Sequence, residues 1–340
     1  MRKNNYLILM FIILLVTLIA CSNGESENAE GESSGEEVTV KLYTSESQDQ
    51  VGAMMNEFKK EHPNINVDIF RTGTEEVIAK LEAERSAGGI EADMVWIADI
   101  DFFNSLDEED MLEEYDSPNA ENLNEDFIYN GGKYYEVRQI FNVLAYNTAH
   151  VTEPLESWHD LYRDDLEGRI AVANPNYSGA ASLTLATLVS NEEFDWDYYV
   201  SLRDNSLKFE QGNGALASKV ASGEYHAVSV VDFMARNAQN EGSPVEVVWP
   251  DEGAIIIPTP VGILEDSDVK EEAKLVIDYL LSEDAQNMFK EQGYIPVNPD
   301  VGVPENAPSV DEIDIMPLDL DFVKENREEL KTEFSNIFNE

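Results

Sequence analysis

The fold class can be inferred from the segment that begins Val38-Thr-Val-Lys-Leu-Tyr43, in which apolar and β-branched residues largely alternate. This pattern is typical of a β-strand. A helix, a strand, a second helix and a third strand are then expected at 50–62, 66–71, 75–86 and 93–97. Strands that alternate with helices in this way predict a parallel sheet with right-handed crossovers, and therefore an α/β protein.

A second unit of the same kind is expected after a strand at 140–147. Further strands are expected at 169–173, 227–231, 245–249 and 254–257, and helices at 180–190, 215–222, 270–293 and 319–338. We expect two lobes, because two such units follow one another and a chain of this length commonly forms two domains. The predicted boundaries are 38–147 plus 255–300 for lobe 1 and 148–254 for lobe 2. The C-terminal segment, 301–340, is expected to be helical and to pack on the lobes.

The composition limits the classes of function that the chain can have. Among 340 residues, 22 are Lys or Arg and 69 are Asp or Glu, which gives a formal charge of −47. Such a surface repels phosphate backbones, so no nucleic-acid partner is expected. Adaptation to high salt is an equally open explanation of the acidity. Because 43% of the residues are hydrophobic, the chain has enough apolar material for a core and is not globally disordered.

The N-terminus predicts export and an anchor. Arg2 and Lys3 precede an apolar run over 6–20, which suits a secretory signal but is shorter than a membrane span. The run ends at Cys21, the only cysteine, in a pattern that resembles the bacterial lipobox. We therefore expect a signal peptide at 1–20, lipidation of Cys21, a flexible tether over 21–37 and attachment to the extracytoplasmic face of the cell membrane. The alternative is an ordinary signal peptide with an incidental cysteine.

Ligands of open α/β sheets bind at the carboxyl ends of the strands, and hydroxyl groups gather there in this sequence. The predicted ligand-binding residues at these strand ends are Thr44, Ser45, Thr72, Thr74, Tyr177 and Ser178, together with Gly179. Ser178 and Gly179 lie at the start of the helix that follows a strand. The backbone N–H groups and the positive end of the helix dipole there would favour an anion. The alternative is that these residues form caps and turns.

Acidic and aromatic residues at the same strand ends are further candidates. Asp232 follows the strand 227–231 and would meet an ammonium group or a sugar hydroxyl, and Asp99 and Asp101 are similar. Tyr43 and Trp96 are expected either as apolar walls of the site or, more simply, as core residues. The competing interpretation of the three carboxylates is that they are ordinary surface or capping groups.

Several segments together resemble a known family. They are Val40-Lys-Leu-Tyr-Thr-Ser45, Thr72-Gly-Thr74, Ala92-Asp-Met-Val-Trp96, Leu144-Ala-Tyr-Asn147, Ser157-Trp-His-Asp-Leu161, Asn174-Pro175 with Ser178-Gly179, Asp278-Tyr-Leu-Leu-Ser-Glu-Asp-Ala-Gln286 and Gly293-Tyr-Ile-Pro-Val297. In this order, behind a lipobox, they resemble the extracellular solute-binding proteins of ABC importers, in the branch that binds ferric iron, phosphonates and sugar phosphates. The resemblance implies a type II periplasmic-binding fold, with two α/β lobes joined by hinge strands around a small solute.

The resemblance also implies a permease partner and leaves the solute open. Ferric-binding members carry adjacent tyrosines where this chain has Asp232-Phe233, which counts against iron. We therefore expect a small organic anion, such as a phosphonate or sugar phosphate, with ferric iron as the alternative. The four isolated histidines and the lack of a Gly-x-Ser-x-Gly motif favour neither a metal site nor a hydrolase. We expect a monomer without a cofactor or catalytic activity; a lipid-anchored enzyme or an interaction module are the remote alternatives.

Overall fold

The computed structural model describes residues 37–121 and 123–339. The predicted signal peptide, Cys21 and all but the last residue of the tether lie outside these residues. Residues 36–340 form one compact unit. In the described part of the chain, no helix is both long and apolar enough to cross a bilayer.

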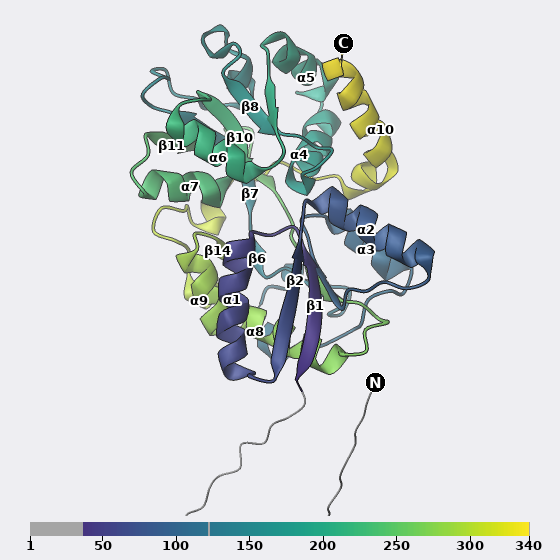
Figure 1. Ribbon diagram of the computed structural model, residues 1–340. Helices are drawn as coiled ribbons and strands as arrows, with labels where there is room; N and C mark the ends of the chain where they lie inside the picture. Colours follow the sequence, from purple (N-terminus) through teal and green to yellow (C-terminus); the bar gives the residue numbers. More distant parts are fainter. Residues whose placement is uncertain (1–36, 122, 340) are drawn as a thin grey trace, which may run out of the picture. The chain divides into compact units, whose positions relative to one another are not determined.

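The first lobe is built on a six-stranded sheet (Figure 1). Its order is β2 (Ile65–Arg71), β1 (Val38–Thr44), β3 (Met94–Trp96), β13 (Val261–Ile263), β5 (Tyr134–Tyr135) and β4 (Ile128–Tyr129). β1 pairs in parallel with both β2 and β3, as the alternation of strands and helices predicts. β13 comes from much later in the chain and adds antiparallel to β3, a strand that the sequence pattern does not reveal.

Helices cover both faces of this sheet because side chains alternate along β1. Val40 and Leu42 pack in one buried cluster with Phe58 of α1, whereas Tyr43 packs in the other with Val77 of α2. The helices of this lobe are α1 (Gln48–Glu61), α2 (Thr74–Ala87), α3 (Ile100–Glu108), α8 (Lys270–Leu281) and α9 (Glu283–Glu291). The last two replace the single helix expected at 270–293. They separate at Ser282, whose extended backbone ends α8 and whose hydroxyl caps α9.

The second lobe has its own sheet, in the order β11 (Val245–Val248), β7 (Phe141–Asn147), β10 (Ala227–Val231), β8 (Ile170–Ala173) and β9 (Lys208–Glu210), with β12 (Ile255–Ile256) also paired to β7. Its helices are α4 (Gly179–Ser190), α5 (Asp195–Asp204), α6 (Asn213–Ser222) and α7 (Asp232–Asn240).

The strand pairing corrects the predicted boundary between the lobes. The sequence analysis assigned 140–147 and the segment from 255 onward to lobe 1. The structure instead pairs β7 antiparallel with β10, β11 and β12, so Phe141–Asn147 and Ile255–Ile256 belong to the second sheet. The later strand β13 belongs to the first sheet. β7 is buried along its whole length, as expected for a central strand. Its apolar pattern predicts that it is a strand but does not identify its partners.

Two segments of chain pass side by side between the sheets. The Ile257 amide donates to the Ile140 carbonyl at 2.8 Å, and the Thr259 amide donates to both carboxylate oxygens of Glu136, at 2.9 and 3.0 Å. A short antiparallel pair, β6 (Arg138–Gln139) with β14 (Ile295–Pro296), lies beside them. These connections are the hinge of a two-lobe α/β fold, and the fold class is therefore confirmed.

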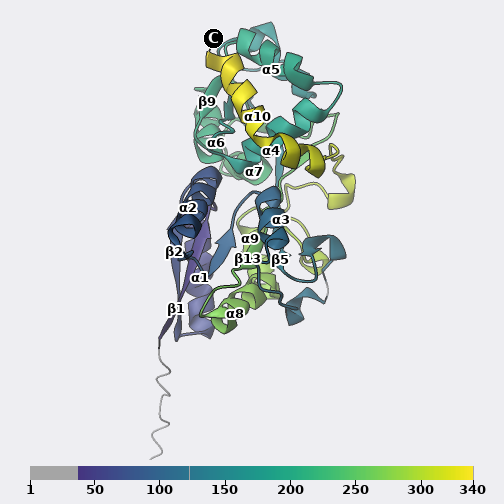
Figure 2. The same cartoon turned by 90° about the vertical axis from the view of Figure 1, so that its right-hand side faces the viewer.

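The C-terminal helix, α10 (Leu320–Asn339), packs against α4 and α5 of the second lobe and also contacts α3 of the first. Figures 1 and 2 show it, in yellow, running along the second lobe with one end beside the first. Short 3-10 helices at Pro118–Ala120, Glu125–Phe127, Trp158–Tyr162, Asp164–Leu166, Pro299–Val301 and Val310–Glu312 complete the described elements.

Candidate functional site

A cleft of about 400 Å³ lies between the two sheets and is lined by both lobes. The lining residues are Ser45, Glu46, Ser47, Gln48, Asp49, Arg71, Thr74, Ala98, Ile140, Ser178, Ala180, Asn213, Gly214, Val231, Phe233, Met234, Ile257, Thr259 and Tyr294. Most of the polar lining residues belong to loops and helix starts, whereas Ile140, Ile257 and Thr259 belong to the hinge.

Five helices begin at this cleft. Their first-turn or capping residues in its lining are Gln48 for α1, Thr74 for α2, Ser178 for α4, Asn213 for α6 and Phe233 for α7. The first turn of a helix carries backbone N–H groups that have no partner within the helix, and the helix dipole is positive there. Convergence of five such ends makes the cleft favourable for a negatively charged group, in spite of the acidity of the whole chain.

Hydroxyl side chains add donors to these helix ends. Ser45 Oγ accepts from the Ala98 amide and Ser178 Oγ accepts from the Ala181 amide, each at 3.3 Å. Because both oxygens are acceptors in these bonds, their hydrogens stay available to a ligand. Ser178 is also the N-cap of α4, so a single residue serves both the structural and the ligand-binding interpretation.

The lobes approach closely at one rim of the cleft. A Cβ at Gly179 would collide with the Ala98 carbonyl oxygen of the first lobe, and a Cβ at Gly73 would lie 2.9 Å from the Tyr177 carbonyl oxygen of the second. Only glycine leaves room for these backbone contacts. Gly179 therefore stands at the meeting of the lobes and makes their approach possible.

The charged side chains of the cleft have both signs. Glu46 and Asp49 line it as carboxylates and Arg71 as a cation. Glu46 forms a buried ion pair with Arg138, whose guanidinium lies 4.3 Å from the centre of the Tyr294 ring. Burial raises the pKa of Glu46, and the nearby Arg138 and Arg71 oppose that rise. The carboxylates can accept hydrogen bonds from hydroxyl or ammonium groups of a solute.

A second buried carboxyl group lies in the hinge behind the cleft. Glu136 accepts bonds from the backbone and the hydroxyl of Thr259, and Arg138 donates to that hydroxyl oxygen at 3.1 Å. Burial raises the pKa of Glu136 to about 8, although these bonds and Arg138 act to lower it. The hinge thus contains a carboxyl that holds a proton near neutral pH.

The structure brings together some of the residues predicted from the sequence. Ser45, Thr74 and Ser178 line the cleft from both lobes, and Gly179 lies at the rim. The other hydroxyl and tyrosine candidates lie elsewhere. Thr44 is buried and donates to the Trp96 carbonyl, Thr72 bonds to Glu76, Tyr43 donates to Glu84 within the first lobe, and Tyr177 has an exposed side chain outside the lining.

The predicted acidic candidates have structural partners instead. Asp232 is fully buried, accepts from the Phe141 amide at 2.9 Å and pairs with Arg236. Asp99 caps α3 through the Phe102 amide. Asp99 and Asp101 both form ion pairs with Arg327 of α10. None of the three aspartates is among the lining residues of the cleft, and each has a partner within the chain, while Trp96 is buried in the core.

Sequence reasoning missed several lining residues. Asn213 and Gly214 follow the strand β9 and begin a helix, which is the pattern that identified Ser178. That signal was present in Gln211-Gly-Asn-Gly214 and could have been used. Thr259 and Tyr294 reach the cleft through the hinge and the segment after α9, and no local pattern predicts that placement.

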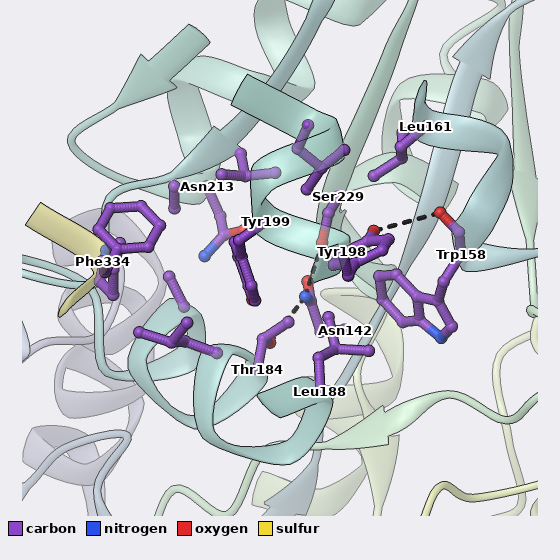
Figure 3. Close-up of a pocket in the computed structure, with 16 residues that line it drawn as sticks. Asn142, Trp158, Leu161, Thr184, Leu188, Tyr198, Tyr199, Asn213, Ser229 and Phe334 are labelled. Atoms are coloured by element: carbon purple, nitrogen blue, oxygen red, sulfur yellow. Dashed lines mark hydrogen bonds between the residues drawn. The ribbon is translucent and has the colours of Figure 1, made fainter. Parts of the chain in front are cut away.

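A separate cavity lies inside the second lobe (Figure 3). Its volume is about 30 Å³, against about 400 Å³ for the cleft. Asn142 donates to Thr184 and Ser229, both at 2.8 Å, and aromatic rings such as Tyr199 and Phe334 close the rest. This cavity is far smaller than the cleft and has few polar lining residues.

One group of potential metal ligands lies away from the cleft. His159, Glu193 and Glu252 place ligand atoms within 4.8 Å of one another on the second lobe, a grouping that the sequence analysis did not foresee. Glu252 already accepts from Ser157 and from the Trp158 amide. His159 Nδ1 is bonded to the Tyr162 hydroxyl at 2.6 Å. These partners account for the arrangement as part of the local 3-10 helix and its surroundings.

The two-lobe fold and the cleft between its sheets define a protein of the type II periplasmic-binding class. A model of the family described as bacterial extracellular solute-binding protein matches residues 90–326, which is more than half of the chain. The chain belongs to this family. It is accordingly a periplasmic or extracellular solute-binding protein of the kind that serves ABC importers.

Curated relatives and solved structures agree with this assignment. Spermidine/putrescine-binding periplasmic protein 1 of Haemophilus influenzae is 26% identical over 294 residues, 78% of this chain and 77% of that protein. A putative 2-aminoethylphosphonate-binding periplasmic protein of Salmonella typhi is 27% identical over 168 residues, 46% of this chain and half of its own length. These relatives are named for binding and not for catalysis.

Among solved structures, the periplasmic binding protein AfuA of Actinobacillus pleuropneumoniae, with fructose-6-phosphate bound, has a TM-score of 0.80. It is 22% identical, and the match covers 89% of this chain and 99% of that one. Iron-bound HitA of Pseudomonas aeruginosa has a TM-score of 0.76 at 17% identity and covers 87% and 99% of the two chains. At these identities the likeness establishes the fold.

Proposed function

We propose that this protein captures a small organic anion, such as a phosphonate or a sugar phosphate, in the cleft and delivers it to the permease of an ABC importer. The observation that carries the proposal is the convergence of five helix N-termini on one cavity, with Ser45, Thr74 and Ser178 beside them. Together these groups supply N–H and O–H donors to an anionic head group.

The rest of the lining suits an organic group attached to that anion. Ile140, Ile257 and Phe233 give the cleft apolar surface, and Glu46 and Asp49 can accept bonds from hydroxyl or ammonium groups. A sugar phosphate and an aminoalkyl phosphonate both combine an anion with such donors. The proteins that bind fructose-6-phosphate and, by name, 2-aminoethylphosphonate support the same class of solute by similarity.

Ferric iron is less well supported by the cleft. Tyr294 is the one tyrosine among the described lining residues, and its hydroxyl donates to Gln50 at 2.6 Å. The adjacent pairs Tyr134-Tyr135 and Tyr198-Tyr199 are buried within the lobes and do not line the cleft. A polyamine is a second candidate, because the carboxylates of Glu46 and Asp49 face the cleft and one relative is named for spermidine and putrescine.

The proposal includes how the protein works at the membrane. Cys21 would carry a lipid that holds the folded body on the extracytoplasmic face, and the segment up to residue 37 would act as a tether. Binding would be the whole task of a monomer, without turnover of the solute. Closure of the lobes around the solute, which favours the closed state, would be the working step.

The test is thermal unfolding of residues 36–340, which form a compact unit by themselves. The panel comprises phosphonates, sugar phosphates, putrescine, spermidine and ferric citrate. A ligand at 100 times its Kd stabilises the protein by roughly 2.7 kcal/mol, a shift of a few degrees. We expect a shift with a phosphorus-containing anion that is lost on Ser178→Ala with Thr74→Ala. A shift only with ferric citrate or only with the polyamines would contradict the proposed anion.

A further inference from the structure

We propose that α10 is an electrostatic latch between the lobes: it is anchored to the second lobe by apolar contacts and holds the first lobe through Arg327 and Lys331. The inference rests on the proposed function in one respect, namely that separation of the lobes opens the solute cleft. It assigns to these two residues the control of solute affinity from outside the cleft.

The attachment of α10 to the second lobe is apolar. The Phe334 ring lies 5.8 Å from that of Tyr199 and 5.3 Å from that of Phe209, and Phe338 lies 4.8 Å from Phe209. Leu330 is also buried in this cluster. Buried apolar surface of this extent does not separate easily in water, so α10 is expected to move with the second lobe.

The attachment to the first lobe is ionic. Arg327 Nη2 lies 2.9 Å from Glu75 Oε1 and 2.5 Å from Asp99 Oδ2, while its Nη1 lies 3.7 Å from Asp101 Oδ2. Lys331 Nζ lies 2.6 Å from Glu75 Oε2. All of these side chains are at most 18% exposed, so solvent screens the pairs less than those of an open surface.

The carboxylates of the latch adjoin residues of the cleft. Glu75 follows Thr74, which lines the cleft at the start of α2. Asp99 follows Ala98, whose carbonyl oxygen meets Gly179 of the second lobe. The ion pairs therefore form at the same rim at which the lobes approach, and a separation of the lobes at that rim would break them.

The difference between the two attachments makes the latch reversible. Ion pairs of this kind weaken in salt, whereas the apolar anchor does not. Loss of the pairs would shift the equilibrium toward separated lobes and reduce the affinity for a solute that binds both lobes. A coupling of ordinary size corresponds to about fivefold or more in the ratio of the two states.

The same helix supplies a matched control. Lys324 of α10 pairs with Glu108 of α3, but these side chains are 45% and 61% exposed. Exposed pairs contribute little to stability. Lys324→Gln removes the same charge from the same helix as Arg327→Gln, so it controls for net charge and for the helix itself.

The test measures the distance between the lobes without a solute. Spin labels are placed at Ala79→Cys on α2 and Ser218→Cys on α6, both exposed, in residues 36–340, which lack the single native cysteine. Double electron–electron resonance then gives the distribution of distances in 0.1 M NaCl. We expect Arg327→Gln and Glu75→Gln to move population to longer distances by about fivefold or more, and Lys324→Gln to leave the distribution unchanged.

Raising NaCl to 1 M should narrow the difference between wild type and Arg327→Gln, because salt weakens the ion pairs that the variant has already lost, although their partial burial limits the screening. The salt series also measures the wild-type protein, in which the latch is intact, so it stays informative if one variant folds poorly. Distributions that are the same for wild type, Arg327→Gln and Glu75→Gln would overturn the latch. Since no solute is present, that outcome would leave the proposed solute class untouched, and a failed solute screen would leave the latch untouched.

Discussion

The cleft between the lobes and the small cavity inside the second lobe show two different uses of polar groups. In the small cavity, the Asn142 amide donates to Thr184 and Ser229, and aromatic rings border the rest of the space (Figure 3). In the cleft, helix N-termini and the hydroxyls of Ser45 and Ser178 keep donors available. The volumes, about 30 and about 400 Å³, differ in the same sense.

Enclosure alone therefore does not identify a binding site. Polar groups that satisfy one another stabilise a lobe, whereas donors that converge on a space large enough for a solute can recognise one. The comparison makes a clear demand on variants. Changes at self-satisfied groups should reduce stability and leave binding intact. Changes at the cleft should reduce binding and leave stability nearly unchanged.

The largest effect is expected at Asp232, which the structure places among the self-satisfied groups. Asp232→Asn leaves the buried Arg236 without its ionic partner. We expect the free energy of unfolding in urea to fall by roughly 3–5 kcal/mol. Asp49→Asn, which changes a carboxylate in the cleft lining, is the control and should have little effect on unfolding. Equal and small losses in both variants would show that the Asp232–Arg236 pair does not stabilise the fold.

The hinge should show itself in the pH dependence of stability. The pKa of Glu136 is about 8 in the folded chain, above its ordinary 4.5. Between these values the folded protein holds a proton that the unfolded chain releases. This stabilising contribution is therefore complete below about pH 4.5 and lost as the pH rises to 8. Relative to Glu136→Gln, wild type should lose roughly 2–4 kcal/mol over this range in urea unfolding. Parallel pH profiles would show that Glu136 is ionised throughout.

Gly179 tests the cleft without removing a donor. Gly179→Ala places a methyl group against the Ala98 carbonyl and should hold the lobes apart, while α4 tolerates alanine. We expect the affinity for the anion found by thermal unfolding to fall about tenfold or more, about 1.4 kcal/mol, with little loss of stability. Gly214→Ala is the matched control, because a Cβ there meets no atom within 4 Å although the residue lines the cleft. Unchanged affinity in Gly179→Ala would argue against capture by lobe approach.

The smallest loss of stability is expected inside the small cavity of the second lobe. Thr184→Val keeps the shape of the side chain but removes the oxygen that accepts from Asn142. Stability in urea should fall by about 1 kcal/mol, with the solute affinity unchanged in titration calorimetry. A large loss of affinity in this variant would remove the distinction between the two cavities.

The sequence predicted the fold well because its signals are local. The strand at 38–43, the helix after it and the parallel pairing of β1 with β3 follow from apolar periodicity and from the order of elements. The domain boundary was wrong because the partner of β7 is set by packing across the sheet. Ser282, which divides α8 from α9, lies in a helical pattern that shows no break by periodicity alone.

The candidate site was predicted in part for the same reason. Ser178 and Thr74 lie at the starts of helices, and that position can be inferred from the neighbouring residues. Asp232 pairs with Arg236, four residues later on the same helix, and that spacing favours an ion pair that the sequence could have indicated. For Asp99, the capping of α3 is local and was foreseen as an alternative, whereas the ion pair with Arg327 was not, because that partner lies more than two hundred residues away.

The most direct measurement of the central claim is titration calorimetry of residues 36–340 with the phosphorus-containing anion that stabilises them most. Wild type is compared with the double variant Ser178→Ala, Thr74→Ala and with Ser218→Ala, an exposed serine outside the cleft lining. The cleft predicts saturable binding of one anion per chain, lost or weakened by at least tenfold in the double variant and intact in Ser218→Ala. Equal affinity in all three proteins would place the anion elsewhere and contradict the proposed site.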